Sequence, residues 1–154
     1  MFLKLCKRFP FFVKKYLEIA LKNARFIQTY FLTKNGNLLH NFKNKKTSIN
    51  GYLEDYCFVI EAFINLYQVT LNEHWLRIAK QLTDYCFDNF YDETKHFFRF
   101  KSIQDEALIT THFEIEDNVI AASNSVMANN LMTLSVFYNN NYYEDVVQKM
   151  LHHV

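Results

Sequence analysis

A dense group of polar side chains lies between Glu114 and Leu131, at the start of a mostly apolar segment. The sequence there reads Glu-Ile-Glu-Asp-Asn-Val-Ile-Ala-Ala-Ser-Asn-Ser-Val-Met-Ala-Asn-Asn-Leu. A second group, Glu54 and Asp55, opens another apolar segment. Two carboxylates can act as general acid and base when their separation suits the reaction and the pKa of one of them is raised. Carboxylates, amides and hydroxyls also form hydrogen bonds with sugar hydroxyls.

These two groups are predicted to form one site. Its candidate catalytic residues are Asp55 and Asp117, and its candidate substrate-binding residues are Glu54, Asn118, Asn124 and Ser125. A purely structural role stays open for all of them. Carboxylates are stabilised at a helix N-terminus by the helix dipole, and Ser or Asn there can cap the helix. Glu114 and Glu116 are interpreted as solvated loop charges.

Several other functions lack the residues that they need. The histidines have no metal-ligand spacing, and two glycines can hardly build a phosphate-binding loop, so no metal or cofactor is expected. The net charge of +1 gives no basic field for nucleic acid. No window reaches about 18 uncharged apolar residues, so no membrane span is predicted. Three cysteines without a Cys-x-x-Cys indicate a reducing, cytoplasmic setting, with Cys57 and Cys86 in the core.

Apolar periodicity predicts an all-α chain in which these groups lie at helix starts. Residues 1–10 are expected to be an N-terminal tail, and residues 11–154 a single α-helical domain. Amphipathic helices are predicted at 11–32, 73–90 and 142–152, and helices that are apolar almost all round at 52–69 and 123–138. Asn72 is the expected N-cap of the helix that follows it. Segments 97–101 and 107–111 are predicted to pair as a short β-hairpin.

The order of these elements suggests a ring of helical hairpins. Outer, amphipathic helices alternate with inner, apolar ones, and each long loop precedes an inner helix, so both inner N-termini should open on one rim. Tyr16-Leu17-Glu18-Ile19-Ala20 is similar to Trp75-Leu76-Arg77-Ile78-Ala79, which points to a degenerate repeat. The predicted fold is a partial (α/α)6 toroid.

Three motifs in order carry a family resemblance. They are Gly51-Tyr52-Leu53-Glu54-Asp55-Tyr56, then Leu66-Tyr67-Gln68-Val69-Thr70 followed by Trp75-Leu76, and Ala122-Ser123-Asn124-Ser125-Val126. From about Phe11 to Leu151 the chain resembles the helical portion of the spermatogenesis-associated, thioredoxin-domain-containing protein family. The resemblance implies an α/α toroid related to six-hairpin glycosidases and N-acylglucosamine epimerases. The chain departs from the family in lacking a thioredoxin-like domain, and in having five predicted helices where a complete toroid has twelve.

Two functions of different kinds follow. One is a toroid segment that binds or processes a carbohydrate-like small molecule at the inner-helix rim. The alternative is a non-catalytic helical module, or a degenerate fragment of a larger thioredoxin-domain protein. In that case the uncovered apolar faces of the inner helices are expected to associate with another copy or with the remainder of the toroid.

Overall fold

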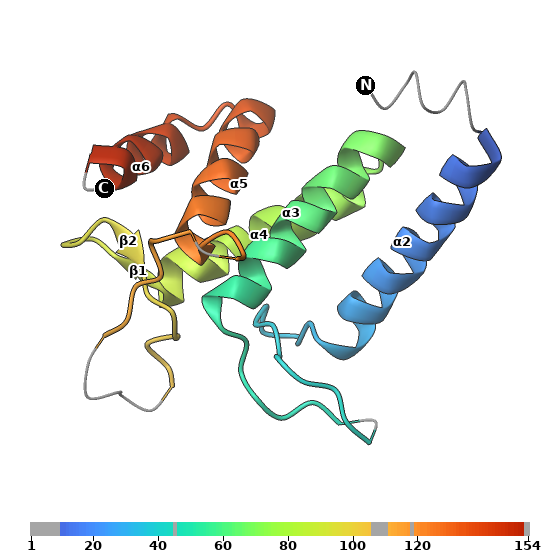
Figure 1. Ribbon diagram of the computed structural model, residues 1–154, viewed down its shortest axis with the longest axis horizontal. Helices are drawn as coiled ribbons and strands as arrows, with labels where there is room; N and C mark the ends of the chain where they lie inside the picture. Colours follow the sequence, from blue (N-terminus) through green and yellow to red (C-terminus); the bar gives the residue numbers. More distant parts are fainter. Residues whose placement is uncertain (1–9, 45, 106–110, 118, 153–154) are drawn as a thin grey trace.

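Five helices and one small hairpin make up the described part of the chain, residues 10–44, 46–105, 111–117 and 119–152 of a computed structural model (Figure 1). In chain order these are α2 (Pro10–Tyr30), α3 (Leu53–Thr70), α4 (Glu73–Asn89), β1 (Tyr91–Asp92), β2 (Phe97–Phe98), α5 (Ser123–Tyr138) and α6 (Asn141–His152). The predicted helices are confirmed, with ends that differ by no more than two residues. Residues 1–9, most of the predicted tail, lie outside the described ranges.

The helices form an inner and an outer set, as the apolar patterning predicts. Inner helix α3 packs against α2, α4 and α5, while α5 packs against α3 and α6. Both inner helices begin on the side of the molecule where the two long connections lie (Figure 1). The predicted common rim is therefore present.

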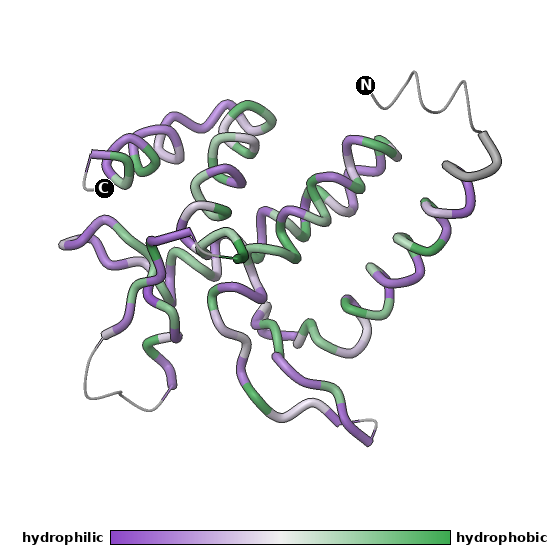
Figure 2. The backbone as a smooth tube through the Cα atoms, in the orientation of Figure 1, coloured by the Kyte–Doolittle hydropathy of each residue, from purple (hydrophilic) through white to green (hydrophobic). Residues whose placement is uncertain are grey.

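Burial follows the patterning along each helix. In α3 the fully or nearly fully buried side chains include Leu53, Tyr56, Cys57, Ile60 and Phe63, each no more than 1% exposed. The outer helices α4 and α6 alternate buried and exposed positions, whereas in α2 only Ala24 is buried among the described side chains. Figure 2 shows hydrophobic and hydrophilic residues alternating along α2 and α6. Because α3 is covered by three other helices, it is the centre of the apolar core.

Local signals fix several helix ends. The side chain of Asn72 accepts a hydrogen bond of 3.0 Å from the backbone N–H of His74, so the predicted N-cap of α4 is confirmed. Both inner helices end at a residue in the left-handed region, Leu71 with φ 55° and Asn139 with φ 50°. Their N–H groups bond to the carbonyls of Tyr67 and Ser135.

A two-stranded hairpin follows α4 directly. Phe97 and Phe98 pair antiparallel with Asp92 and Tyr91. The predicted partner segment 107–111 lies, apart from Thr111, outside the described residues. The short turn between Asp92 and Phe97 brings these two strands together. None of the helices in the described ranges is long and apolar enough to cross a membrane.

Candidate functional site

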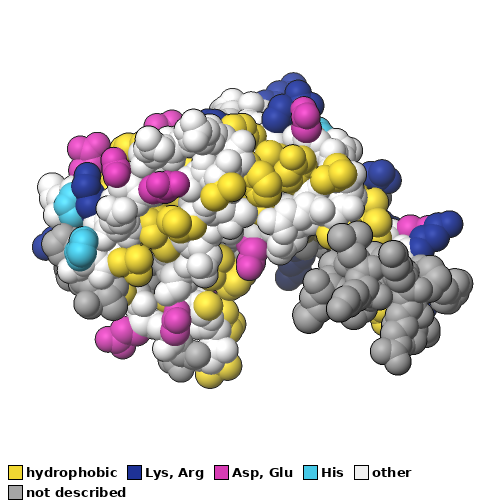
Figure 3. Space-filling view, turned by 90° about the horizontal axis from the view of Figure 1, so that it is seen from above, with side chains coloured by type: hydrophobic (Ala, Val, Ile, Leu, Met, Phe, Trp, Pro, Cys, Tyr) yellow, Lys and Arg dark blue, Asp and Glu magenta, His cyan; other side chains and the backbone are white. Residues whose placement is uncertain are grey.

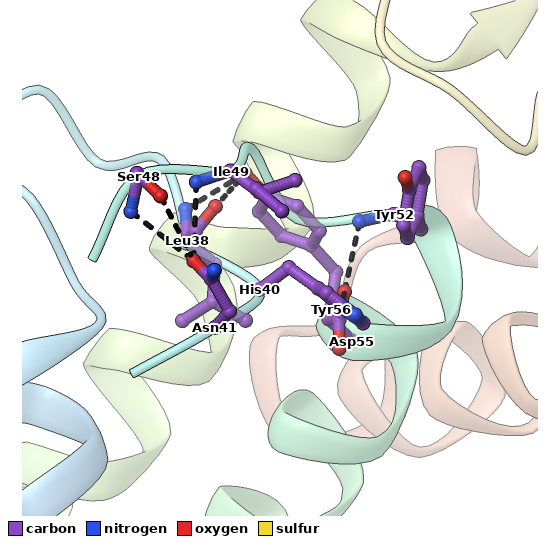
Figure 4. A network of polar contacts seen from close by, with 8 residues as sticks. All are labelled: Leu38, His40, Asn41, Ser48, Ile49, Tyr52, Asp55 and Tyr56. Atoms are coloured by element: carbon purple, nitrogen blue, oxygen red, sulfur yellow. Dashed lines mark hydrogen bonds and ion pairs between the residues drawn. The ribbon is translucent and has the colours of Figure 1, made fainter. Parts of the chain in front are cut away.

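Asp55 lies in the first turn of α3 and joins the helix to a histidine. Its Oδ2 accepts a hydrogen bond of 2.9 Å from the Tyr52 backbone N–H and lies 2.8 Å from Nδ1 of His40 (Figure 4). The His40 side chain is 37% exposed, so a solute can reach its ring. A carboxylate that orients an imidazole is a common arrangement for general acid–base chemistry. Sequence reasoning missed His40, since it lies in a loop without periodicity, 15 residues before Asp55.

The loop that carries His40 is fixed against α3. The buried Tyr56 hydroxyl accepts a hydrogen bond of 2.8 Å from the Leu38 N–H, and the His40 N–H donates to the Ile49 carbonyl over 2.8 Å (Figure 4). The N–H of Gly51 donates to the Leu38 carbonyl. A Cβ at Gly51 would lie 2.9 Å from that carbonyl oxygen, so only glycine fits without a shift. The position of His40 is therefore held by backbone bonds.

A row of four rings runs along the rim from this pair. The ring centroids of His40 and Tyr52 are 5.1 Å apart, and Tyr52 stacks on Phe100 at 5.0 Å. Phe100 in turn meets His112 edge-on at 5.7 Å. The ammonium group of Lys101 lies 5.9 Å from the Tyr52 ring centroid. His40 and His112 are exposed and Tyr52 and Phe100 are half-buried, and rings that reach the surface in this way suit stacking against a flat or apolar face of a ligand.

The start of α5 is capped by carboxylates from the preceding loop. Asp117 accepts a hydrogen bond of 2.8 Å from the N–H of Ala122, which occupies the N-cap position and has no polar side chain. That bond, together with one from the Ser125 hydroxyl, lowers the pKa of Asp117. Glu114 accepts from both the N–H and the hydroxyl of Ser123. The interpretation of Glu114 as a solvated charge was wrong, because this half-buried carboxylate is a cap.

Asn124 connects α5 to the hairpin and to the loop. Only 2% of it is exposed. Its Oδ1 accepts from the Phe98 N–H at 2.8 Å, and its Nδ2 donates to the carbonyls of Phe98 and Glu114 at 3.0 and 2.9 Å. The amide group therefore makes three hydrogen bonds within the protein, which is nearly all that it can form.

The two inner helices touch near their starts. The thiol of Cys57 lies 3.1 Å from the Ser123 carbonyl, and the Asn130 side chain donates to the Cys57 carbonyl over 2.8 Å. Burial raises the pKa of Cys57, and the negative charges of Glu114 and Glu54 raise it further. Glu114 is hydrogen-bonded to Ser123, and Glu54 lies one helical turn before Cys57 on α3, so both carboxylates lie near this junction. The predicted core position of Cys57 is confirmed.

Two hollows adjoin beside the start of α5. The larger has a volume of about 540 Å³ and is lined by Phe97, Ile115, Glu116, Asp117, Asn124, Ser125, Ala128, Met150 and Leu151. The smaller, of about 300 Å³, is lined by His112, Phe113, Glu114, Ile115 and Glu116. They share Ile115 and Glu116. Volumes of this size suit small-molecule ligands.

The predicted site residues fall into two groups. Asp117, Asn124 and Ser125 line the larger hollow. Glu54 and Asp55 lie in the first turn of α3, beside the ring row, and line neither hollow. Asn118 lies outside the described residues. Within the described ranges, no three His, Cys, Asp or Glu residues gather as metal ligands would.

Comparisons with known proteins agree with this architecture. No protein-family model matches the chain. The chain is 29% identical over 128 residues to the uncharacterized Caenorhabditis elegans protein B0495.5, a match that covers 78% of the chain and 17% of the worm protein. The crystal structure of D-mannose isomerase superposes with a TM-score of 0.72 at 14% identity, covering 99% of this chain and 38% of the isomerase.

The structural match establishes the fold of the chain. The helical hairpins form part of an α/α toroid, the fold class that D-mannose isomerase shares with N-acylglucosamine epimerase-like proteins and six-hairpin glycosidases. At 14% identity the likeness extends to fold and not to activity. The chain spans well under half of either protein that it matches, 17% of the worm protein and 38% of the isomerase.

Proposed function

We propose that this toroid segment binds a carbohydrate-like, polyhydroxylated small molecule at the inner-helix rim. The observation that carries the proposal is the pair of neighbouring hollows at the start of α5, which share Ile115 and Glu116 and are lined by carboxylates, an amide, a hydroxyl and an imidazole. Such groups match the hydroxyls of a sugar, and the apolar lining suits its CH faces. The fold shared with a sugar isomerase supports the same ligand class.

Each group of rim residues has its own proposed role. Asp117 and Ser125 bind substrate hydroxyls in the larger hollow, and Asn124 forms part of its wall. Asn118, which follows Asp117 in the sequence, is a further proposed substrate-binding residue. His40, oriented by Asp55, lines neither hollow, so its proposed proton exchange requires a substrate that extends along the ring row from His112 to His40. Asp117 is the second catalytic carboxylate. Glu54 adds negative charge near the junction of the two inner helices. We propose these catalytic roles for a toroid in which all of the helical hairpins are present.

We also propose that the chain belongs to the thioredoxin-domain-containing family that its three motifs resemble. The motif residues have defined positions in the structure: Gly51 fits where a Cβ would collide, and Asn124 bonds to the hairpin. Cys57 and Cys86 are buried free thiols, which fits the reducing, cytoplasmic setting proposed for the protein. We propose that residues 11–154 form one helical unit of this family.

Ligand titration by NMR or calorimetry tests the proposal. D-mannose, D-fructose and N-acetylglucosamine are titrated into the intact chain, and at least one is expected to bind. Replacing Asp117 with Asn is expected to weaken that binding by about tenfold or more, because a hydrogen bond to a charged group contributes about 1.5–3 kcal/mol. Asp55→Asn is expected to weaken it less, since Asp55 lines neither hollow.

The control variant removes one negative charge, as Asp117→Asn does, but at a position away from the rim. Glu93, an exposed carboxylate in the β1–β2 turn, is changed to Gln and should leave binding unaltered. Far-ultraviolet circular dichroism checks that helicity is unchanged in every variant. Loss of helicity in Asp117→Asn with no change in sugar binding, or absence of binding to all three sugars, would reject the proposal.

A further inference from the structure

The net charge of +1 conceals an uneven distribution of charge along the chain. Residues 1–50 carry eleven of the seventeen Lys and Arg residues but only one of the sixteen Asp and Glu residues, Glu18. That stretch therefore has a charge of +10 (eleven bases minus one acid), and residues 51–154 have a charge of −9 (six bases minus fifteen acids). A separation of charge of this size points to a negatively charged partner at the basic end.

The described bases of that stretch lie on α2 and on the loop that follows it. Those with exposed side chains are Lys14, Lys15, Lys22, Arg25, Lys34, Lys43 and Lys46. None of these seven bases forms an ion pair with a carboxylate of the described residues. Figure 3 shows that, on the face seen from above, most Asp and Glu side chains lie away from α2, which is at the right of the view. The positive charge on this side of the molecule is therefore left without internal partners.

Bases and apolar side chains share one stripe of α2. Its residues, at spacings of four, three, four and four, are Lys15, Ile19, Lys22, Phe26 and Tyr30. These spacings place the five residues on one face of the helix, along about 22 Å of its length. All five side chains are exposed, Ile19 to 47%, Phe26 to 41% and Tyr30 to 47%. The stripe therefore presents charge and apolar surface together to the solvent.

The loop after α2 extends this stripe. The Phe42 ring packs against the rings of Phe26 and Tyr30, with centroid distances of 5.3 and 5.1 Å. Lys43 and Lys46 pair through two backbone hydrogen bonds of 2.9 Å, so the chain turns back directly after Phe42 and both exposed lysines lie at that turn. The basic-aromatic face is the surface formed by Lys15, Ile19, Lys22, Phe26, Tyr30, Phe42, Lys43 and Lys46.

We infer that the basic-aromatic face binds the surface of an anionic lipid bilayer. Its lysines attract the anionic headgroups, while its rings and Ile19 enter the boundary between headgroups and acyl chains, where aromatic rings are favoured. In this arrangement α2 lies in the plane of the interface and does not cross the bilayer. None of the eight residues of the face lines either hollow at the start of α5, so the inference goes beyond the proposed sugar binding and does not rest on it.

Two other partners match the basic-aromatic face less well. A second copy of the chain, placed face to face, would bring two basic surfaces together. Single-stranded nucleic acid would place its phosphates on the lysines and stack its bases on the rings, but it offers no apolar environment to Ile19. A bilayer surface complements both the charges and the apolar side chains.

Co-sedimentation of the intact chain with lipid vesicles tests the inference. One set of vesicles is pure phosphatidylcholine, and the other contains about 30% phosphatidylserine, an anionic lipid. The chain is expected to bind the second set at least about tenfold more tightly than the first. That binding should weaken in about 0.5 M NaCl, because salt screens the attraction between the lysines and the headgroups.

Two matched double variants locate the charges that matter. Lys15→Gln with Lys22→Gln removes two bases from the face, and Lys95→Gln with Lys149→Gln removes two exposed bases elsewhere. The first pair is expected to weaken binding to the anionic vesicles by about tenfold or more, and the second by no more than about twofold. Sugar binding at the rim should be unaltered in both, so the two proposals can fail separately.

A further pair of variants tests the apolar part of the face. Ile19→Gln is expected to weaken binding to the anionic vesicles by about fivefold, because half of this side chain is available to enter the interface. Val136→Gln, which changes an exposed apolar residue of α5, should leave binding unchanged. Circular dichroism checks that helicity is the same in every variant.

Four outcomes would overturn the inference. The first is equal binding to the two sets of vesicles, or binding to neither. The second is an equal loss of binding in the two double variants. The third is vesicle binding that Ile19→Gln leaves unchanged. The fourth is binding to a single-stranded oligouridylate that is as tight as vesicle binding and is lost in the Lys15→Gln and Lys22→Gln variant, which would make nucleic acid the ligand.

Discussion

The starts of α3 and α5 perform the same structural task with different parts. At α3 the capping carboxylate, Asp55, belongs to the helix itself and reaches back three residues to the Tyr52 N–H. At α5 the caps come from outside, since Asp117 and Glu114 lie five and nine residues before the groups that they bind. One start is thus built locally, and the other depends on its loop.

The same contrast separates the chemistry of the two starts. The helix-borne carboxylate of Asp55 is free to orient the His40 ring from a neighbouring loop. The loop-borne carboxylates shape the hollows beside α5, because the segment that caps the helix also forms the walls. In the proposed function, His40 and Asp55 at the start of α3 exchange protons, while Asp117 at the start of α5 both binds substrate and is the second catalytic carboxylate. Substitutions at each start can separate these roles.

The largest effect is expected at Asn124. Replacing it with Ala removes the partners of the Phe98 N–H and carbonyl, which are buried with the hairpin. We expect a loss of about 3 kcal/mol in the free energy of unfolding, because buried polar groups of the backbone are left unsatisfied. Urea unfolding measures the loss. Asn129→Ala, an exposed position in the same helix, should change stability by no more than about 0.5 kcal/mol.

A smaller effect on stability is expected at the start of α3. Tyr56→Phe removes the hydroxyl that accepts the Leu38 N–H, so we expect a loss of about 1–2 kcal/mol. The loop that carries His40 should then exchange its amide protons faster, while the amides of α5 should not. Tyr67→Phe, on the same helix, is the matched control. Equal acceleration at both helix starts would show that the two starts do not behave independently.

The smallest effect is expected in how the stability of the protein depends on pH in acid. Hydrogen bonds from the Ala122 N–H and the Ser125 hydroxyl lower the pKa of Asp117 in the folded protein. Its contribution to stability is therefore complete above the ordinary carboxylate value of about 4, and it is lost as the pH falls through the lowered value. The difference in unfolding midpoint between the natural chain and Asp117→Asn should shrink over that range. A difference that stays constant with pH would contradict this.

Much of the fold could be predicted from the sequence because helices leave a periodic signal. The segment 123–138 is confirmed at both ends, and the apolar circumference of α3 identified it as an inner helix. The hairpin was harder to predict, since two-residue strands have no periodicity. Phe97 and Phe98 pair with the residues just after α4, a choice that depends on tertiary packing.

The site was predicted only in part, for a related physical reason. Acidic and amide residues at helix starts are visible in a sequence, so Asp55 and Asp117 could be named as candidates, and their catalytic roles remain a prediction. His40 and Glu114 were not, because their roles depend on where two irregular loops fold. No spacing rule predicts that a loop carboxylate caps the helix residue nine positions after it. The assignment of substrate roles to Glu54, Asn118, Asn124 and Ser125 remains a prediction.

The contact between Cys57 and Ser123 has a practical consequence. The thiol is fully buried between the two inner helices, and its burial keeps it in the unreactive protonated form. A thiol-modifying reagent can reach it only when the helices that cover it move, and separation of α3 from α5 is one such movement. The rate at which Cys57 is modified would therefore measure how often the rim opens, and a ligand that bridges the two helix starts should slow that rate.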